Sequence, residues 1–256
     1  MANQWQNFLR NRGEWRGSFV RVDPTGSLHP GAPSILTLEP APEERMVRFG
    51  LRRWPEGTPV APGGGPEGEV GAPTREIAQE YRSLGRQVVF FETGTFCKGS
   101  LQVAPTTAFG GEFGFLRGDR RHRLVVLYEE AGPLDHLVLI REYRAGSGAA
   151  EGSATTAEQL LGQWRGEEAT ISADWLEPQT REVDVAMGPA DLEGLRLLPD
   201  GGFCLLPERV SHREAFAVEA GWLPAPGQLE RLIRRYDATG AWQSATHQRL
   251  ERLSAS

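Results

Sequence analysis

Four short segments occur twice in this chain of 256 residues, in the same order in each half, and this repetition constrains the fold more than any other feature. The four pairs are GEWRG and GQWRG (residues 13–17 and 162–166), GTFC and GGFC (94–97 and 201–204), His122-Arg123 and His212-Arg213, and LIREY and LIRRY (139–143 and 232–236). Because chance matches of short strings do not keep their order, the sequence predicts two homologous units in tandem.

The predicted first unit covers residues 1–146 and the second covers residues 155–256, with a small-residue linker at 147–154. A Pro- and Gly-rich insertion at residues 55–73 has almost nothing to bury, so we expect a mobile loop there. The insertion contains the spacing G-x-G-x-x-G, but Pro66 removes a backbone amide and no helix signal follows at once. We therefore expect no dinucleotide site.

Most of the remaining sequence has strand patterns, with β-branched and aromatic residues bounded by Gly, Pro and Asp turns. A short helical signal precedes each Trp pentapeptide: Trp5 and Phe8 form an apolar stripe in the first unit, and Thr155 and Glu158 have capping-box spacing in the second. About eight short strands per unit are typical of a barrel or a sandwich, and a small meander closes into a barrel because closure removes its edges. The sequence predicts an all-β protein of two antiparallel barrels, each preceded by a short helix.

A short helix, a Gly-x-Trp that opens the first strand and a run of up-and-down strands resemble the calycin superfamily of lipocalin-like barrels. FLRNRGEWRGSF, EYRSLGRQVVFFETGTFCKGS, EFGFLRGDRRHRLVVLY and QLLGQWRGEEATI extend the resemblance to a family of tandem calycin-like proteins of cyanobacteria and chloroplasts. This domain-of-unknown-function family includes a chloroplast biogenesis factor for ATP synthase. The resemblance spans nearly the whole chain and implies assembly of the enzyme's soluble head through contacts with its β and γ subunits.

Arg141 and Arg234 occupy matched positions inside apolar strands, where a buried charge needs a partner. In calycin barrels a basic side chain from a late strand typically stacks on the Gly-x-Trp indole. The resemblance therefore implies that Arg141 covers Trp15 and that Arg234 covers Trp164, as structural cation-π contacts that close each barrel.

Four further tryptophans lie near predicted strand ends or turns. Exposed tryptophan is enriched at the centre of protein interfaces, so these four are candidate anchors for a partner protein, with a place in the core as the alternative for half or more of them. They are Trp54, Trp175, Trp222 and Trp242.

We expect no catalytic residues, no metal site and no cofactor. The five histidines show no metal-ligand spacing, and Cys97 and Cys204 are interpreted as small buried residues on the inner face of equivalent strands. A thioether-linked pigment on these cysteines is the alternative interpretation. The basic run RGDRRHR at residues 117–123 is interpreted as a solvated turn between strands.

The net charge of −6 and a pI near 5.5 oppose binding to nucleic acid. No apolar stretch approaches the ~20 residues that a membrane helix needs. Two cysteines are too few for a disulfide framework and fit a reducing compartment. We expect a soluble cytoplasmic protein, or one that is peripheral to the thylakoid membrane.

The sequence leaves three functions open: a non-enzymatic assembly factor, a carrier of a small apolar ligand such as a bilin, a carotenoid or a fatty-acid-like molecule, and a bilin lyase. An assembly factor predicts barrels filled by bulky inward side chains. A ligand carrier predicts an open apolar cavity of roughly a few hundred Å³.

Overall fold

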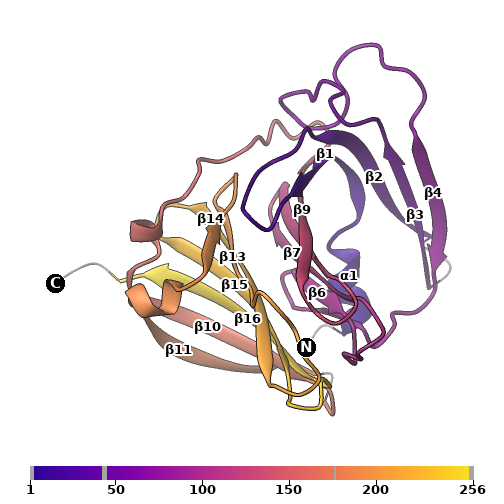
Figure 1. Ribbon diagram of the computed structural model, residues 1–256. Helices are drawn as coiled ribbons and strands as arrows, with labels where there is room; N and C mark the ends of the chain where they lie inside the picture. The colour runs from indigo at the N-terminus through magenta and orange to yellow at the C-terminus, as the bar shows by residue number, and fades with distance from the viewer. Residues whose placement is uncertain (1–2, 42–44, 176, 254–256) are drawn as a thin grey trace.

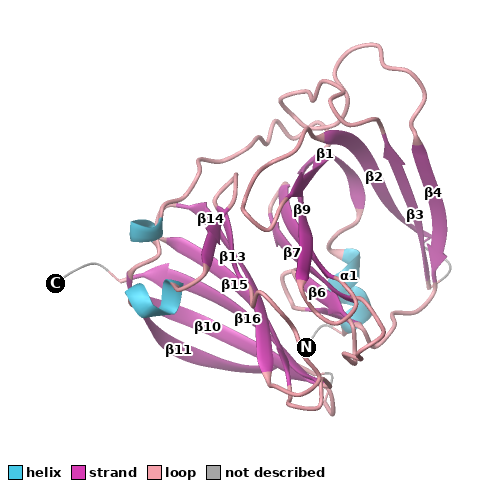
Figure 2. Cartoon of the chain, in the orientation of Figure 1, coloured by secondary structure: helices cyan, strands magenta, loops and turns pink. Residues whose placement is uncertain are grey.

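The computed structural model describes residues 3–41, 45–175 and 177–253, and nearly all of its regular structure is β-strand (Figure 1, Figure 2). The strands form two antiparallel sheets, one of nine strands and one of seven. The first sheet contains β1 (Gly13–Val22), β2 (Ala32–Ala41), β3 (Met46–Arg53), β4 (Arg75–Tyr81), β5 (Val88–Phe90), β6 (Phe96–Gly99), β7 (Phe109–Arg117), β8 (Arg120–Tyr128) and β9 (Leu134–Arg144). The second contains β10 (Gly162–Ser172), β11 (Gln179–Met187), β12 (Leu195–Leu197), β13 (Gly202–Leu205), β14 (Phe216–Ala225), β15 (Gln228–Tyr236) and β16 (Trp242–Arg252).

In each sheet the first strand of the unit pairs with its last strand. The strand order is β4-β3-β2-β1-β9-β8-β7-β6-β5 in the first sheet and β11-β10-β16-β15-β14-β13-β12 in the second. Each sheet curls, and its two outermost strands do not pair with each other among the described residues. The predicted all-β class with two tandem barrel-like units is confirmed, and each unit has one open seam, between β4 and β5 in the first and between β11 and β12 in the second.

A short helical element precedes each sheet. Helix α1 (Gln4–Leu9) comes before β1, and a 3-10 turn, η1 (Ala157–Gln159), comes before β10; a second 3-10 turn, η2 (Pro189–Leu192), lies between β11 and β12. The Gln4 side chain pairs with the backbone of Phe90 on β5, accepting from its N–H at 2.7 Å and donating to its carbonyl at 2.9 Å. Gln4 therefore covers the free edge of β5 in the way that a neighbouring strand would.

The largest apolar cluster lies between the two sheets rather than inside either unit. Leu124 and Val126 of β8 belong to it, together with Val218 of β14 and Leu232 of β15. Figure 1 shows β7 and β9 of the first sheet facing β14 to β16 of the second. Because side chains alternate along a strand, these strands present a second set of side chains to the interior of their own unit. The outer faces of the two sheets thus bury each other.

Each unit also has an interior cluster around its repeated tryptophan. In the first unit, Trp15 packs in a cluster with Leu36 of β2. In the second unit, Trp164 packs in a cluster with Leu160 and with Phe203 of β13. The strands at the centre of the molecule are therefore covered on both faces.

The Pro- and Gly-rich loop at residues 55–73 is anchored on β1 at its centre. The N–H of Gly65 donates to the carbonyl of Gly17 at 3.1 Å. Gly64 has a φ of +77°, and a Cβ at this position would lie 2.2 Å from the carbonyl oxygen of Arg16, so glycine is required there. The loop was expected to have almost nothing to bury, but Gly64 and Gly65 are buried, which corrects that expectation for these two residues. The next regular element after the loop is strand β4, which does not provide the helix that a dinucleotide motif needs.

The segment at residues 147–154 contacts both units. Glu151 forms an ion pair with Arg141 of β9. The N–H of Gly152 donates to Oδ1 of Asp200, which lies in the second unit. These contacts tie the connection to the junction of the two sheets.

Candidate functional site

Trp15 and Trp164 are buried at the start of β1 and β10 and are held in the same way. Each indole Nε1 donates to a carbonyl four residues earlier in the chain, Trp15 to Asn11 at 2.8 Å and Trp164 to Leu160 at 2.9 Å. Both side chains have no exposed surface. They fill the end of each unit and do not reach a partner.

The cations over these indoles are Arg144 and Arg252. The guanidinium carbon of Arg144 lies 4.4 Å from the ring centroid of Trp15, and that of Arg252 lies 4.5 Å from the centroid of Trp164. In each unit the arginine is the direct partner of the tryptophan across the first and last strands. Arg121 of β8 also lies over Trp15, at 4.8 Å.

The expected contacts of Arg141 with Trp15 and of Arg234 with Trp164 are therefore wrong. Arg141 lies on β9 three residues before Arg144, and this odd spacing turns the two side chains to opposite faces of the strand. Arg234 lies on β15, whereas the strand that pairs with β10 is β16. The segments LIREY and LIRRY thus occupy strands that are not equivalent.

Arg234 instead joins the second sheet to the first. It has no exposed surface, and its Nη2 donates to the carbonyls of Gly99 at 3.2 Å and Ser100 at 3.4 Å. Its Nε donates to the hydroxyl of Tyr236 at 2.7 Å, and its guanidinium carbon lies 4.4 Å from the ring centroid of Trp242. The buried charge therefore has partners, but they lie across the contact between the units.

His122 also lies in this contact, on β8, whereas the matching His212 lies in a bend before β14. Nδ1 of His122 is 3.3 Å from Oδ2 of Asp200. Burial lowers the pKa of His122 below its usual 6.5, although the Asp200 carboxylate opposes this shift. The histidine is packed between the sheets, where burial favours its neutral form.

Only one of the four candidate interface tryptophans is exposed. Trp175 is 57% exposed, whereas Trp54 is 6%, Trp222 is 0% and Trp242 is 5% exposed. Trp222 and Trp242 belong to the core between the sheets, and the indole of Trp54 donates to the carbonyl of Gly71 in the adjoining loop. The assignment as partner anchors is wrong for these three, and Trp175 remains a candidate.

Cys97 and Cys204 are free thiols in the core between the sheets. They face the neighbouring sheet and not the interior of their own unit, which corrects the expected inner-face position. Burial raises the pKa of both thiols, that of Cys204 to about 12. Thiols in such surroundings are unreactive.

The interior of the first unit contains a cavity of about 520 Å³ at the open seam between β4 and β5. Helix α1, strands β2 to β8 and the connection between β4 and β5 contribute to its walls. Much of the lining is aromatic or aliphatic, including Phe8, Leu36, Phe49, Phe90 and Phe96. The volume of this cavity meets the criterion stated above for a ligand carrier, but polar and charged side chains such as Lys98 and Glu112 share its walls with the apolar ones.

A cluster of buried charges forms one side of this cavity. Glu142 accepts hydrogen bonds from Nε of Arg121 at 2.7 Å and from Nε of Arg123 at 3.0 Å, and Nη1 of Arg123 donates to Glu112 at 2.8 Å. Burial opposes ionisation of Glu142, but the two guanidinium groups hold its pKa below the usual value.

Sequence reasoning missed this cluster. It interpreted residues 117–123 as a solvated turn, but the turn ends before β8, and Arg121 and Arg123 are buried inside the unit. The available signal was the spacing of the two arginines, which places both on one face of a strand.

The family model for the N-terminal part of DUF3598, a domain of unknown function, matches residues 1–147. The chain belongs to the DUF3598 family. A crystal structure of a protein of unknown function from the DUF3598 family, from Nostoc punctiforme PCC 73102, is 32% identical to this chain. The two superpose with a TM-score of 0.81 over 99% of this chain and 100% of that chain.

Residues 187–253 of this DUF3598 protein match the C-terminal domain of Biogenesis factor required for ATP synthase 1. This range contains β12 to β16, and the range matched by the DUF3598 N-terminal model contains β1 to β9. No curated protein matches the chain.

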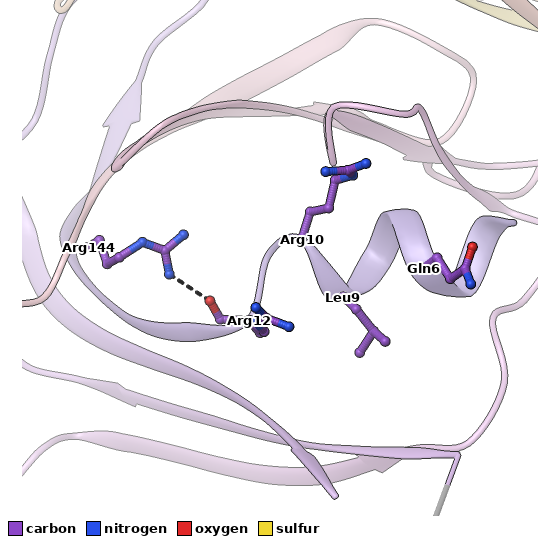
Figure 3. A pocket seen from close by; sticks show the side chains of 5 residues that line it. All are labelled: Gln6, Leu9, Arg10, Arg12 and Arg144. Carbon is purple, nitrogen blue, oxygen red and sulfur yellow. Dashed lines mark hydrogen bonds between the residues drawn. The ribbon is translucent and has the colours of Figure 1, made fainter. Parts of the chain in front are cut away.

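The outside of this DUF3598 protein has an arginine pocket, lined by Gln6, Leu9, Arg10, Arg12 and Arg144 (Figure 3). Nη1 of Arg144 donates to the carbonyl of Arg12 at 2.7 Å, and Arg10 and Arg12 are exposed. Arg144 forms an ion pair with Asp119 at 2.7 Å, so Arg10 and Arg12 supply the positive charge of the pocket on a protein whose net charge is −6. Such a surface is complementary to an acidic segment.

Across the described residues of this DUF3598 protein, no group of three or more His, Cys, Asp or Glu side chains is arranged to hold a metal ion. None of the helices in the described part has the length and apolar character to cross a membrane.

Proposed function

We propose that this protein assists the biogenesis of ATP synthase as a non-enzymatic, chaperone-like factor that holds subunits of the soluble catalytic head. The match of residues 187–253 to the C-terminal domain of Biogenesis factor required for ATP synthase 1 carries this proposal. The proposed partners are the β and γ subunits. The proposed location is the cytoplasm, with a peripheral position at the thylakoid membrane as the alternative.

The core shared by the two sheets supports this role. Because the sheets bury each other's outer faces, they form one body and present their remaining surfaces in fixed relative positions. A fixed arrangement reduces the entropy lost when a partner binds two separate surfaces.

We further propose that residues 1–146 and 155–256 are two calycin-like domains that arose by duplication, joined by residues 147–154. The matched pairs Trp15 with Arg144 and Trp164 with Arg252 support this proposal, because each pair has the same register across the first and last strands. The shared Gly-x-Phe-Cys segments of β6 and β13 support it as well.

Trp175 and the arginine pocket are the proposed contacts with partner subunits. Trp175 exposes more than half of its surface close to the end of β10, which is unusual for so large an apolar side chain. The arginine pocket would contact an acidic segment, and its contribution would weaken as salt concentration rises.

Binding of the full chain to purified β and γ subunits, measured separately by biolayer interferometry, tests the proposal. We expect saturable binding to at least one of them, and we expect Trp175→Ser or the pair Arg10→Glu and Arg12→Glu to weaken it by about tenfold or more. Leu197→Ser, at another exposed apolar position, is the matched control and should leave affinity unchanged. Lack of binding to both subunits would contradict the proposal.

A further inference from the structure

The two open seams differ in what lies beside their outermost strands. At the seam of the second unit, Val183 of β11 and Leu195 of β12 pack against the same interior cluster. At the seam of the first unit lies the cavity of about 520 Å³, and Ile77 and Tyr81 of β4 line it. Space for further side chains thus lies next to the unpaired strands of the first unit.

Of the two strands at this seam, β5 is covered and β4 is not. The side chain of Gln4 occupies the backbone of Phe90 on β5. Within the described part of the chain, β4 pairs with β3 alone, and no backbone hydrogen bond reaches its other edge. All seven residues of β4 are exposed or partly exposed, and Figure 1 shows this strand on the outer side of the first unit. An edge of unpaired N–H and C=O groups is a template for another strand.

The register shows which residues of β4 offer backbone groups to this edge. The carbonyl of Arg53 on β3 accepts from the N–H of Thr74, so the backbone of Arg53 faces β4. Because backbone groups alternate along a strand, every second residue of β3 from Arg53 faces β4, and its partners there are the odd-numbered residues. The even-numbered residues therefore direct their N–H and C=O groups toward the free edge. They are Glu76, Ala78 and Glu80.

The side chains of β4 define what a paired strand would carry. Ile77 and Gln79 line the cavity, so Glu76 and Glu80 lie on the opposite, outer face, where both are exposed. Residues directly opposite each other in an antiparallel pair share a face, and opposite charges there are stabilising. A strand that fits β4 therefore has basic residues four positions apart. The first and third of the three residues between them point toward the cavity and are apolar.

A second copy of this chain does not have this pattern on its own β4. Two β4 strands paired over their full length about a twofold axis place Glu76 of each copy opposite Glu80 of the other. Like charges directly opposite each other are destabilising. The edge thus fits a different polypeptide better than it fits itself.

We propose that the free edge of β4 binds an extended segment of a partner polypeptide by strand addition. Backbone hydrogen bonds to Glu76, Ala78 and Glu80 hold the segment, and two basic residues lie opposite the two glutamates. The apolar residues between them enter the cavity beside Ile77 and Gln79. This site lies apart from Trp175 and the arginine pocket, so it does not depend on the proposed binding of ATP synthase subunits.

Fluorescence anisotropy of a labelled peptide with the full-length protein tests the site. The probe is Ser-Lys-Leu-Thr-Val-Lys-Ser with both ends capped, and we expect saturable binding. The same peptide with Glu in place of both Lys residues should bind at least about tenfold more weakly.

Two methylated peptides distinguish strand addition from other kinds of contact. In the proposed register the peptide's Thr lies opposite Ala78 and directs its N–H toward β4, whereas the next residue, Val, directs its N–H away. Methylation of the Thr amide should weaken binding at least about tenfold, and methylation of the Val amide should leave it unchanged. Equal binding of the two methylated peptides would overturn the proposal.

Protein variants locate the site on β4. Ala78→Pro removes an N–H at the free edge without removing a bond to β3, and it should weaken binding at least about tenfold. The matched control is Ala186→Pro on β11. Ala186 is exposed and pairs with Gln163, whose carbonyl faces β16, so its own N–H also points to a free edge. This control should bind the peptide as the unmodified protein does.

Charge reversal on the exposed face gives a variant that does not depend on proline. Glu76→Lys with Glu80→Lys should bind the Glu peptide more tightly than the Lys peptide. An unchanged preference for the Lys peptide, or no binding of that peptide to the unmodified protein, would contradict the site. Sedimentation of the protein alone as a dimer that Ala78→Pro dissociates would show that a second copy takes this edge, which would also overturn the proposal.

Discussion

His122 of the first sheet stacks on Trp222 of the second, with ring centroids 5.6 Å apart and planes inclined by 16°. Arg120, two residues earlier on β8, also lies over Trp222, with its guanidinium carbon 5.0 Å from the ring centroid. The indole Nε1 donates to the carbonyl of Asp200 at 2.8 Å. A side chain of the second unit is thus held by residues of the first, so its loss affects the stability of both.

Trp222→Ala should lower the free energy of unfolding by about 3–5 kcal/mol, since the side chain has no exposed surface and leaves a cavity between the sheets. Urea denaturation followed by circular dichroism measures this change. Trp175→Ala is the control and should change stability by no more than about 0.5 kcal/mol. A loss below about 1 kcal/mol for Trp222→Ala would contradict the shared core.

The protein should lose stability below about pH 6.5 because of His122. Burial keeps the folded-state pKa of His122 below its usual 6.5, so the unfolded chain takes up a proton first as the pH falls. The lowered pKa of Asp200 adds a loss in the same direction at still lower pH. Urea denaturation at about pH 7.5 and about pH 5.5 should show a smaller difference for His122→Gln than for the unmodified protein. An unchanged difference would mean that His122 does not contribute to it.

Arg252→Met should destabilise the protein, because it removes the contact with Trp164, worth about 0.5–1 kcal/mol, and the hydrogen bonds that Arg252 donates to the carbonyls of Leu161 and Gln159. A double-mutant cycle with Trp164→Leu isolates the coupling between the two side chains. Arg165→Met is the control, because Arg165 is exposed and its ion pair with Asp184 lies on the surface. Zero coupling between Arg252 and Trp164 would refute the assignment of this pair.

Cys97 and Cys204 should not react with a thiol reagent such as dithionitrobenzoate while the protein is folded. Both thiols are buried, and their raised pKa values leave little thiolate at neutral pH. Absorbance of the released product should report two thiols per chain in denaturant and close to none without it. Rapid labelling of the folded protein would contradict the burial of the two thiols.

Gly64→Val should release the loop at residues 55–73 from β1, because the new Cβ would collide with the carbonyl of Arg16. Faster cleavage in this loop by a glutamate-specific protease, at Glu56, Glu67 or Glu69, is the expected result. Gly63→Val is the matched control, since nothing lies within 4 Å of a Cβ at that position. Equal cleavage of the two variants would indicate that the loop is not anchored at Gly64.

The sequence predicted the fold class and the positions of the two repeated tryptophans because both depend on local requirements. Gly13 and Gly162, at the start of the two Trp pentapeptides, have φ values of +117° and +120°, which other residues rarely adopt. A short motif that contains such a glycine marks the same structural point in both units. The segments LIREY and LIRRY contain no such glycine, so their similarity does not mark equivalent strands. This similarity led to the wrong assignment of Arg141 and Arg234.

The face on which a residue lies was harder to predict at the centre of the molecule. Strands β7, β8 and β9 are covered on one side by the interior of the first unit and on the other by the second sheet. Alternation of polar and apolar residues reveals the buried face only when the other face is in water. Strand β6 is covered in the same way, with Phe96 in the interior cluster of the first unit and Cys97 in the cluster between the sheets, which explains why Cys97 was assigned to the wrong face.

The cavity of the first unit was not predicted, because the residues that line it are distant from one another in the sequence. Glu142 follows Arg121 on the next strand, and only the register of β8 and β9 brings their side chains together. Arg121 and Arg123 were expected in a solvated turn, so their ion pairs with Glu142 required the three-dimensional structure.

Because the two sheets bury each other, the protein should tolerate cleavage of the polypeptide between its two units. Residues 147–154 tie together units that are already joined by their own apolar surfaces and by Arg234 and Trp222, so the covalent connection adds little to the attraction between them. Two fragments produced by cleavage in this segment would therefore reassociate into one particle, whereas either fragment alone would expose an apolar sheet face and aggregate. The contact between the two units thus resembles a subunit interface within one chain.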